Sequence, residues 1–577
     1  MDEQTNGAAG SGWASGQWSR RSLFRRAAVV AIAVPGIPTL LAACGGQTPS
    51  TSGGGAQSTS AGSSGSNSAS TAASSAANAK PGGSLVIGLN LEPDNLDPAV
   101  TPFAVSHTVM MNIYDPLVWR GDDGNFVPGL ADKWEASSDG LNYSFTLKSN
   151  VKFHDGTAFN ADAVKFTLDH IVDPASHSGF AANLLGPYDH TEVSDPTTAK
   201  VVFKQPFAPF LDGASQAFLG IVSPTAVQKD GKAFLRNPIG TGFMKFKEWA
   251  EKDHITLVRN PDYNWSASIF AHKGTAYLDQ VTFRFYTDDP TRLAALESGD
   301  VQDIETIAYS DLQRIKSDSK YTVLTGYTPG IPAILMLDTT KAPTTDLTVR
   351  QALNYATDRN AIVTTALFGA STPATGPLWS STPGYSKAVE SYYPHDASKA
   401  GQVLQQAGWV AGADGIRAKG GQRLSVTWSE TPSADAYAEL LQAQWRQAGV
   451  ELQIQKMTTA AAFQAIEKSQ VNTATIGWIS SDPVILSNLF LSTNINGGYA
   501  WTKYANSQMD DLLNQAQRAL DEAQRANLYG QVQKIIMDQA LIVPLYGQLR
   551  TIGILSKFQG IKLDFRRYQW LFDAHTA

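Results

Sequence analysis

The stretch LADKWEASSDGLNYSFTLKSNVKFHDGTAFNADAVKFTLD, residues 130–169, contains both of the common hydrophobic periodicities. Apolar side chains alternate along its middle, which is typical of a strand with one buried face: Leu141, Tyr143, Phe145 and Leu147. Its end predicts a helix that begins after Asn160, an N-cap residue, and stops before Pro174. This helix would bury one stripe, formed by Val164, Leu168 and Ile171. A strand and a helix in one short stretch indicate mixed α/β structure.

The same two patterns alternate along the rest of the chain. The segment GSLVIGLN predicts a strand that buries Leu85, Ile87 and Leu89. Further strands are predicted at residues 254–260, 280–287, 423–430 and 450–457. Between them, DPTRLAALESGD predicts a helix capped by Asp289, with Pro290 in its first turn and Gly299 as its stop. DRNAIVTTALFG repeats this arrangement with Asp358 and Gly369, and no internal repeat is visible.

The single cysteine of the 577 residues, Cys44, ends a segment that is typical of secretion signals. Arginines precede an uncharged run at residues 27–43, and Gly45 and Gly46 follow the cysteine. The run is shorter than the roughly 20 residues that a membrane-spanning helix needs, and Pro35 and Pro38 interrupt it. We therefore expect an export signal and not a permanent transmembrane helix.

Two short motifs refine this expectation. SRRSLFR, residues 19–25, resembles the twin-arginine export signal, and LAAC, residues 41–44, resembles a bacterial lipobox. The resemblance implies that residues 1–44 are a lipoprotein signal peptide and that Cys44 becomes the lipidated first residue of the mature chain. The alternative is that Cys44 is a buried small apolar residue. Residues 45–80 consist mainly of Ser, Gly, Ala and Thr and predict a disordered tether that spans about 35 Å.

Composition and motifs exclude several functional classes. The net charge is −7, and no basic patch with interleaved aromatic residues indicates nucleic-acid binding. The nine histidines form no tight pair and no second cysteine is present, so we expect no metal site and no cofactor. His154 and Asp155 could form a catalytic pair, but Asp155-Gly156 is better interpreted as a turn between a strand and a helix. No nucleophile elbow, phosphate loop or dinucleotide motif occurs, so we expect no enzymatic activity.

The opening stretch and five later segments resemble, in order, the family 5 solute-binding proteins of ABC importers. These segments are NPIGTGFMKFKEW (237–249), LVRNPDYNW (257–265), RLAALESGDVQDI (292–304), DLTVRQALNYATDRNAIV (346–363) and KAGQVLQQAGW (399–409). The resemblance covers nearly all of residues 82–550. It implies an α/β, two-lobed, hinged fold of the type II periplasmic-binding-protein class, with an extra domain inserted in the first lobe. The expected boundaries are lobe I at 81–305 with the insertion at about 119–236, lobe II at 306–520, and a return to lobe I at 521–577.

The resemblance also implies a function. The chain would be the substrate-binding lipoprotein of an ABC importer, held on the outer side of the cytoplasmic membrane, in a periplasmic or extracellular position. It would work as a monomer, enclose a small solute between its lobes and deliver it to a permease driven by an ATPase. Peptides are the favoured solute, with oligosaccharides, opines and metal chelates as alternatives. The rivals from other classes are a membrane-tethered hydrolase and a receptor that signals without transport.

The main candidate for ligand contact is TIGWISSDPVILSNLF, residues 475–490. In peptide-binding relatives a Gly-Trp pair is followed by an Asp that pairs with the amino terminus of the ligand. Here Gly477 and Trp478 match, but Ser480 and Ser481 stand where that Asp is expected, and Asp482 follows directly before Pro483. Asp482 is therefore either the amine clasp of a shortened loop or the Asp of an Asp-Pro turn. Trp478 is either an apolar wall of the ligand site or an ordinary interlobe core residue.

Five further residues are weaker candidates for ligand contact. Thr241, Phe243 and Trp379 are suggested by their places in the family pattern, and Tyr499 and Trp501 flank the region after the Gly-Trp loop. Each has a structural role as its alternative.

Overall fold

The computed structural model describes residues 79–431 and 434–577. The predicted signal peptide, its Cys44 and the predicted tether up to residue 78 lie outside the described residues. Among the described residues, no helix has both the length and the apolar character needed to cross a membrane.

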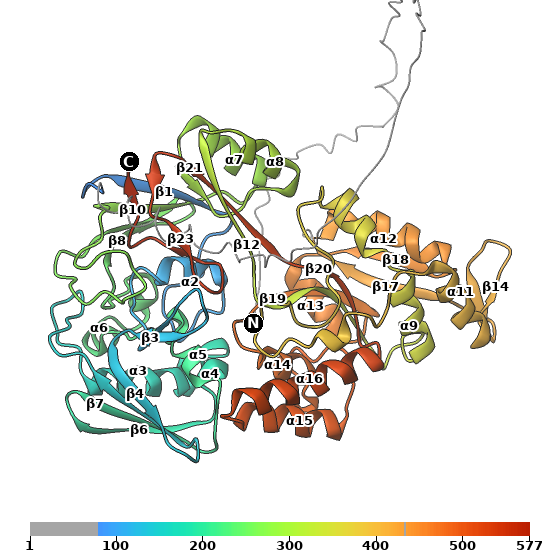
Figure 1. Cartoon of the computed structure of the whole chain (residues 1–577), viewed down its shortest axis with the longest axis horizontal. Helices are drawn as coiled ribbons and strands as arrows, with labels where there is room; N and C mark the ends of the chain where they lie inside the picture. Colours follow the sequence, from blue (N-terminus) through green and yellow to red (C-terminus); the bar gives the residue numbers. More distant parts are fainter. Residues whose placement is uncertain (1–78, 432–433) are drawn as a thin grey trace, which may run out of the picture. The chain divides into compact units, whose positions relative to one another are not determined.

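A seven-stranded mixed sheet contains both early and late parts of the chain (Figure 1). Its strand order is β12 (Tyr321–Tyr327), β21 (Leu549–Leu555), β11 (Asp303–Ile304), β1 (Ser84–Leu89), β10 (Gln280–Phe285), β9 (His254–Arg259) and β8 (Met244–Ala250). The predicted strand at residues 85–89 is confirmed, and Leu85, Ile87 and Leu89 are fully buried. This strand lies between β10 and β11 and runs parallel to both, and helix α7 (Asp289–Ser298) forms the crossover from β10 to β11.

Helix α7 (Asp289–Ser298) begins one residue earlier than its sequence suggested. Its N-cap is Asp288, whose carboxylate accepts a hydrogen bond from the Thr291 N–H at 3.0 Å, so the prediction of Asp289 as the cap was wrong. The helix stops at Gly299, as predicted, because this residue takes the left-handed conformation at φ 88°. Two consecutive Asp residues both suit the cap position, and the sequence does not distinguish them.

A four-stranded antiparallel sheet holds the opening stretch of sequence. Its order is β4 (Ala131–Ala136), β5 (Asn142–Leu147), β7 (Thr198–Phe203) and β6 (Tyr188–Asp195). Helix α3 (Ala161–Val172) packs on this sheet, and the Asn160 side chain accepts from the Ala163 N–H at 3.0 Å, which confirms the predicted helix and cap. This sheet and the seven-stranded sheet share one hydrophobic core, and we call them together lobe I.

A five-stranded sheet forms lobe II. Its order is β18 (Glu451–Lys456), β17 (Ser425–Glu430), β19 (Thr473–Ile479), β13 (Gly330–Leu337) and β20 (Ile542–Tyr546). Strand β13 is buried on both faces because helices cover both sides of the sheet. Helices α9 (Leu347–Ala356), α11 (Ala397–Gln406) and α12 (Asp435–Gln447) share one core with this sheet, and α14 (Ile485–Phe490), α15 (Ser507–Arg518) and α16 (Glu522–Asp538) share the other.

The predicted segment 358–369 has a short helix at its start. Asp358 is the N-cap, as predicted, and accepts from the Ala361 N–H at 2.9 Å. The helix is irregular, since α10 (Arg359–Ala361) continues as a π-helical turn at Ile362–Ala366.

The chain passes between the lobes twice, from β12 to β13 and from β20 back to β21. The two crossings are held together by a hydrogen bond of 3.0 Å from the Thr328 N–H to the Gln548 carbonyl. They lie later in the chain than the predicted boundaries at 306 and 521, because β12 pairs with β21 in lobe I and α16 packs in the core of lobe II. Strands that run from one lobe into the other are the structural basis of a hinge.

Candidate ligand-binding site

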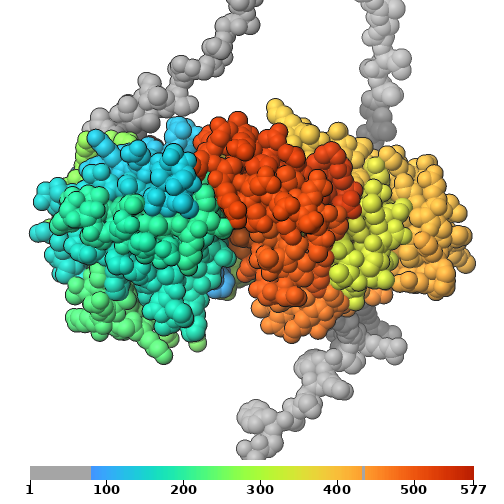
Figure 2. Space-filling model, turned by 90° about the horizontal axis from the view of Figure 1, so that it is seen from below, coloured from blue at the N-terminus to red at the C-terminus, as the bar shows by residue number. Residues whose placement is uncertain are grey.

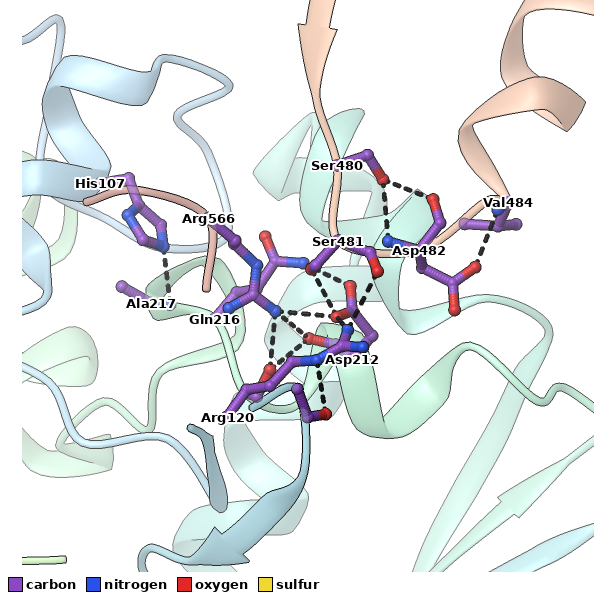
Figure 3. A network of polar contacts seen from close by, with 12 residues as sticks. His107, Arg120, Asp212, Gln216, Ala217, Ser480, Ser481, Asp482, Val484 and Arg566 are labelled. Atoms are coloured by element: carbon purple, nitrogen blue, oxygen red, sulfur yellow. Dashed lines mark hydrogen bonds and ion pairs between the residues drawn. The ribbon is translucent and has the colours of Figure 1, made fainter. Parts of the chain in front are cut away.

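A buried polar network joins the two lobes (Figure 3). Its centre is Asp212 on α5 (Phe210–Gly213) of lobe I, which forms an ion pair with Arg120 at the end of β2 (Val118–Arg120). Arg566 donates to the same carboxylate at 2.9 Å. From lobe II, the Ser481 hydroxyl donates to Asp212 at 2.5 Å, and the Ser481 carbonyl accepts from Arg120 at 3.1 Å. Ser481 therefore binds both members of an ion pair on the other lobe.

The charge on Asp212 is stabilised by its partners. Burial by itself would raise the pKa of this carboxyl, but Arg566 and Arg120, together with the Ser481 hydrogen bond, lower it below its ordinary value. The other carboxylate oxygen accepts from the Gln216 amide at 3.1 Å. Asp212 is thus ionised, its charge is paired with two arginines, and each of its oxygens already has a partner within the protein.

Both oxygens of Asp482 are likewise bonded within the protein. Both of its oxygens accept from the Arg525 guanidinium, at 2.8 and 2.5 Å, and one also accepts from the Val484 N–H at 2.8 Å. Arg525 lies on α16, so this bidentate pair is internal to lobe II. Of the two roles considered for Asp482, the contacts favour the structural one beside Pro483.

A cavity of about 300 Å³ lies between the lobes. Lobe I contributes residues on and after α4 (Phe180–Leu185), and lobe II contributes Trp478 to Ser480 and residues of α14 and α15. Phe180 of lobe I and Trp478 of lobe II both line it and stack on each other, with ring centroids 6.3 Å apart and planes 18° from parallel. Beside the cavity the lobes touch again, through a 2.8 Å bond from the Ala208 N–H to the Gln517 carbonyl and a 2.7 Å bond from Arg518 to Gln205. In Figure 2 the teal surface of the lobe I segment that holds Gln205 and Ala208 lies next to the orange-red surface of the lobe II segment that holds Gln517 and Arg518.

The structure brings part of the predicted site together. Trp478 lines the cavity, and Tyr499 packs on it edge to face at 4.8 Å, but the ring of Trp501 is buried in the lobe II core behind them. Ser481 lies next to the cavity in the polar network and not in its wall. Gly477 and Trp478 lie at the end of strand β19, which leads directly to Ser480 and Ser481.

Three predicted residues lie away from the cavity. Thr241 is fully buried in lobe I and donates to Asp115 at 3.0 Å, and Phe243 packs there against Phe572. Trp379 lies at the hinge, where its backbone N–H donates to the Gly330 carbonyl at 2.8 Å and its indole ring covers Gly547. These contacts give each of the three a structural role in this arrangement.

Sequence reasoning missed most of the residues that form the site. Asp212, Arg120 and Arg566 come from distant parts of lobe I, and no motif marks them. The carboxamides in the cavity wall are equally unmarked: Asn183, Gln205, Gln216, Asn488, Asn494 and Gln517. The segment that contains Asn488 was recognised, but its amide carries no signal by itself.

The described part of the chain has no cluster of metal-ligating side chains, and His154 and Asp155 do not form a catalytic pair. Over residues 79–431 and 434–577 there is no group of three His, Cys, Asp or Glu side chains that could hold a metal ion. The His154 ring bonds the Gly242 carbonyl at 2.9 Å, whereas Asp155 accepts from the Ser223 hydroxyl at 2.6 Å. The two neighbours therefore bind different partners, as expected for a structural turn.

Comparison with known proteins gives a consistent result. Residues 125–498 match the family model for bacterial extracellular solute-binding proteins, family 5 Middle. The chain is 30% identical over 479 residues to the glutathione-binding protein GsiB of Shigella flexneri, which covers 80% of this chain and 88% of that protein.

Two solved structures are similar in fold. The ABC transporter substrate-binding protein CtaP of Listeria monocytogenes superposes with a TM-score of 0.74 at 25% identity, covering 86% of this chain and 100% of that chain. The periplasmic binding protein DppA of Helicobacter pylori, in complex with the peptide STSA, also has a TM-score of 0.74, at 24% identity, and covers 86% and 98%.

Proposed function

The chain belongs to the bacterial extracellular solute-binding proteins of family 5, the substrate-binding components of ABC transporters, and we propose that its solute is a short peptide. It has the two-lobed type II fold of this family. Relatives named for binding glutathione and for a bound peptide support the peptide as the solute class.

One observation carries the proposal: the 300 Å³ cavity has walls from both lobes. A solute in this cavity contacts lobe I and lobe II when they touch, but only one of them when they separate. Its binding therefore shifts the population toward the arrangement in which the lobes are in contact. The volume lies at the lower end of the range of small-molecule pockets and suits a small solute.

A non-peptide solute is the second candidate function. It is favoured by the contacts of Asp482, which is paired with Arg525 and so has no free oxygen for a peptide amino terminus. Ser480 and Ser481 stand where a free carboxylate would be needed.

The expected cellular setting is part of the same proposal. Lipid on Cys44 would hold the chain at the outer face of the cytoplasmic membrane, where the monomer delivers its solute to the permease. The lipobox-like LAAC segment supports this anchoring. Replacing Cys44 with Ser is expected to move the protein from the membrane fraction to the soluble fraction, and an unchanged membrane fraction would contradict the lipid anchor.

Calorimetric titration with a tripeptide library, combined with small-angle scattering, tests solute capture. Trp478→Ala removes one wall of the cavity and is expected to weaken binding by about tenfold or more. Trp249→Ala is the matched control, because this partly buried Trp lies on β8, bonds Glu92 at 2.9 Å and does not line the cavity. The peptide proposal fails if no peptide binds, and a library that is hydrolysed instead of bound would favour the tethered hydrolase.

A further inference from the structure

The wall of the interlobe cavity contains no charged residue. Its nineteen lining residues include no Asp, Glu, Lys, Arg or His, although 17% of the chain is Asp, Glu, Lys or Arg. Six of them are carboxamides instead: Asn183, Gln205, Gln216, Asn488, Asn494 and Gln517. Each carboxamide can both donate and accept hydrogen bonds.

Two of these amides are free, one on each lobe. Asn183 on α4 and Asn488 on α14 form no side-chain hydrogen bond or ion pair with any other residue of the described chain. Asn183 is exposed and Asn488 is half-buried, so both can exchange water for a ligand. A solute that fills the cavity therefore meets one unpaired amide from lobe I and one from lobe II.

Two other amides of the wall, Gln216 and Gln205, are each hydrogen-bonded to a charged side chain. The Gln216 amide nitrogen donates to Asp212, which leaves its carbonyl oxygen without a partner in the described chain. The Gln205 carbonyl oxygen accepts from Arg518, which leaves its amide nitrogen available to donate. Asp212 is thus paired with Arg120 and Arg566 as well as with Gln216, Arg518 donates to the neutral Gln205 oxygen, and lobe I offers the cavity one acceptor and one donor.

From this lining we infer that the part of the solute enclosed in the cavity is uncharged and presents both hydrogen-bond donors and acceptors beside an apolar face. An enclosed ammonium or carboxylate would lose its hydration without gaining a partner of opposite charge, which is strongly unfavourable. Neutral amides or hydroxyls would instead pair with the carboxamides, while the rings of Phe180 and Trp478 cover an apolar side. The inference rests on the proposed solute capture and specifies the chemistry of the solute. Two sources share this chemistry, namely the interior of a peptide chain and a neutral oligosaccharide.

Calorimetric titration of the protein with three probes separates these sources: a free tripeptide, the same tripeptide with an acetylated amino end and an amidated carboxyl end, and a neutral trisaccharide. We expect at least one neutral probe to bind about tenfold or more tightly than the free tripeptide. Tighter binding of the free tripeptide, or no binding of either neutral probe, would overturn the inference. In the first of these cases peptide capture itself still stands. If only the trisaccharide binds, the inference holds and the peptide proposal fails.

A charge placed in the wall gives an independent test. Asn488→Asp keeps the size of the side chain but adds a carboxylate, and it is expected to weaken binding of the neutral probe by about tenfold. Asn527→Asp, on the exposed face of α16, is the matched control and is expected to have no effect on binding. Thermal unfolding of both variants checks that they are folded. Unchanged binding of the neutral probe to a folded Asn488→Asp variant would contradict the inference.

Discussion

Ser481 offers a way to change the contact between the lobes without changing the cavity. Its hydroxyl donates to Asp212 at 2.5 Å across the interface, but its side chain does not line the cavity. When the lobes separate, Asp212 keeps Arg120 and Arg566, and water replaces the serine hydroxyl. Ser481→Ala should therefore destabilise the arrangement with lobes in contact and leave each lobe intact.

The size of the effect follows from the charge on Asp212. A hydrogen bond to a charged group contributes roughly 1.5–3 kcal/mol. Because each 1.4 kcal/mol changes an equilibrium constant tenfold, the ratio of touching to separated lobes should fall by about tenfold or more. Solute affinity should fall by the same factor wherever the separated form predominates without solute, since binding must then provide the closure energy.

Single-molecule energy transfer measures this ratio directly. Cys44 is the only cysteine in the sequence, so a Cys44→Ser background allows specific labelling at Ser194→Cys on lobe I and Glu522→Cys on lobe II, both exposed. Ser215→Ala is the matched control: its hydroxyl belongs to the same network, accepting from Arg566 at 2.8 Å, but it lies within lobe I. A closed fraction that is unchanged in Ser481→Ala, or one that falls equally in Ser215→Ala, would refute this reasoning.

Three further predictions concern stability. Burial raises the pKa of Asp303 to about 8, so the folded state holds a proton that the unfolded state releases, and the contribution of this proton to stability is lost as pH rises from about 4 to about 8. Asp303→Asn should flatten this part of the pH profile of the unfolding free energy in urea, and an unchanged slope would contradict the prediction. Asp482→Asn leaves Arg525 buried without its counter-charge and should lower the free energy of unfolding in urea by about 3–5 kcal/mol while solute binding persists. A variant that keeps full stability and loses only the binding of amine ligands would instead identify Asp482 as an amine clasp. Gly330→Ala should lower the free energy of unfolding by about 2 kcal/mol or more in the same measurement, because φ of Gly330 is 107° and the new Cβ would lie 2.3 Å from the Trp478 carbonyl oxygen. Gly179→Ala is the control, since its new Cβ would meet no atom within 4 Å, and equal losses in the two variants would argue against a steric cause.

Local signals explain why parts of the fold could be predicted from sequence. The helix after Asn160 and the strand at residues 84–89 follow from capping and alternation, which depend only on neighbouring residues. The lobe boundaries were placed too early because β12 and α16 are assigned to their lobes by contacts with distant segments. No local sequence pattern near residue 321 predicts that β12 pairs with β21.

The candidate site was predictable only where a motif marks it. The Gly-Trp pair located Trp478, whereas Asn183 and Asn488 lie far apart in the chain and meet one cavity only through the fold. The alternatives for Asp482 depended on a partner that the sequence could not identify, since Arg525 lies on a different helix. A charge in a loop is equally compatible with a ligand and with an internal ion pair until its neighbours are known.

Closure and cavity assembly are partly the same event in this protein. Gln205 and Gln517 line the cavity, and the same two residues join the lobes through their bonds to Arg518 and to the Ala208 N–H. A solute that orders these residues therefore strengthens the lobe contact, and the contact in turn completes the solute site. Ser481 differs because it joins the lobes without lining the cavity. If the interlobe bonds were too strong, the lobes would stay in contact without a solute, and the permease could not distinguish empty from loaded protein. We therefore expect the solute to supply a large share of the closing free energy, and substitutions at Ser481 to change solute affinity although this residue does not line the cavity.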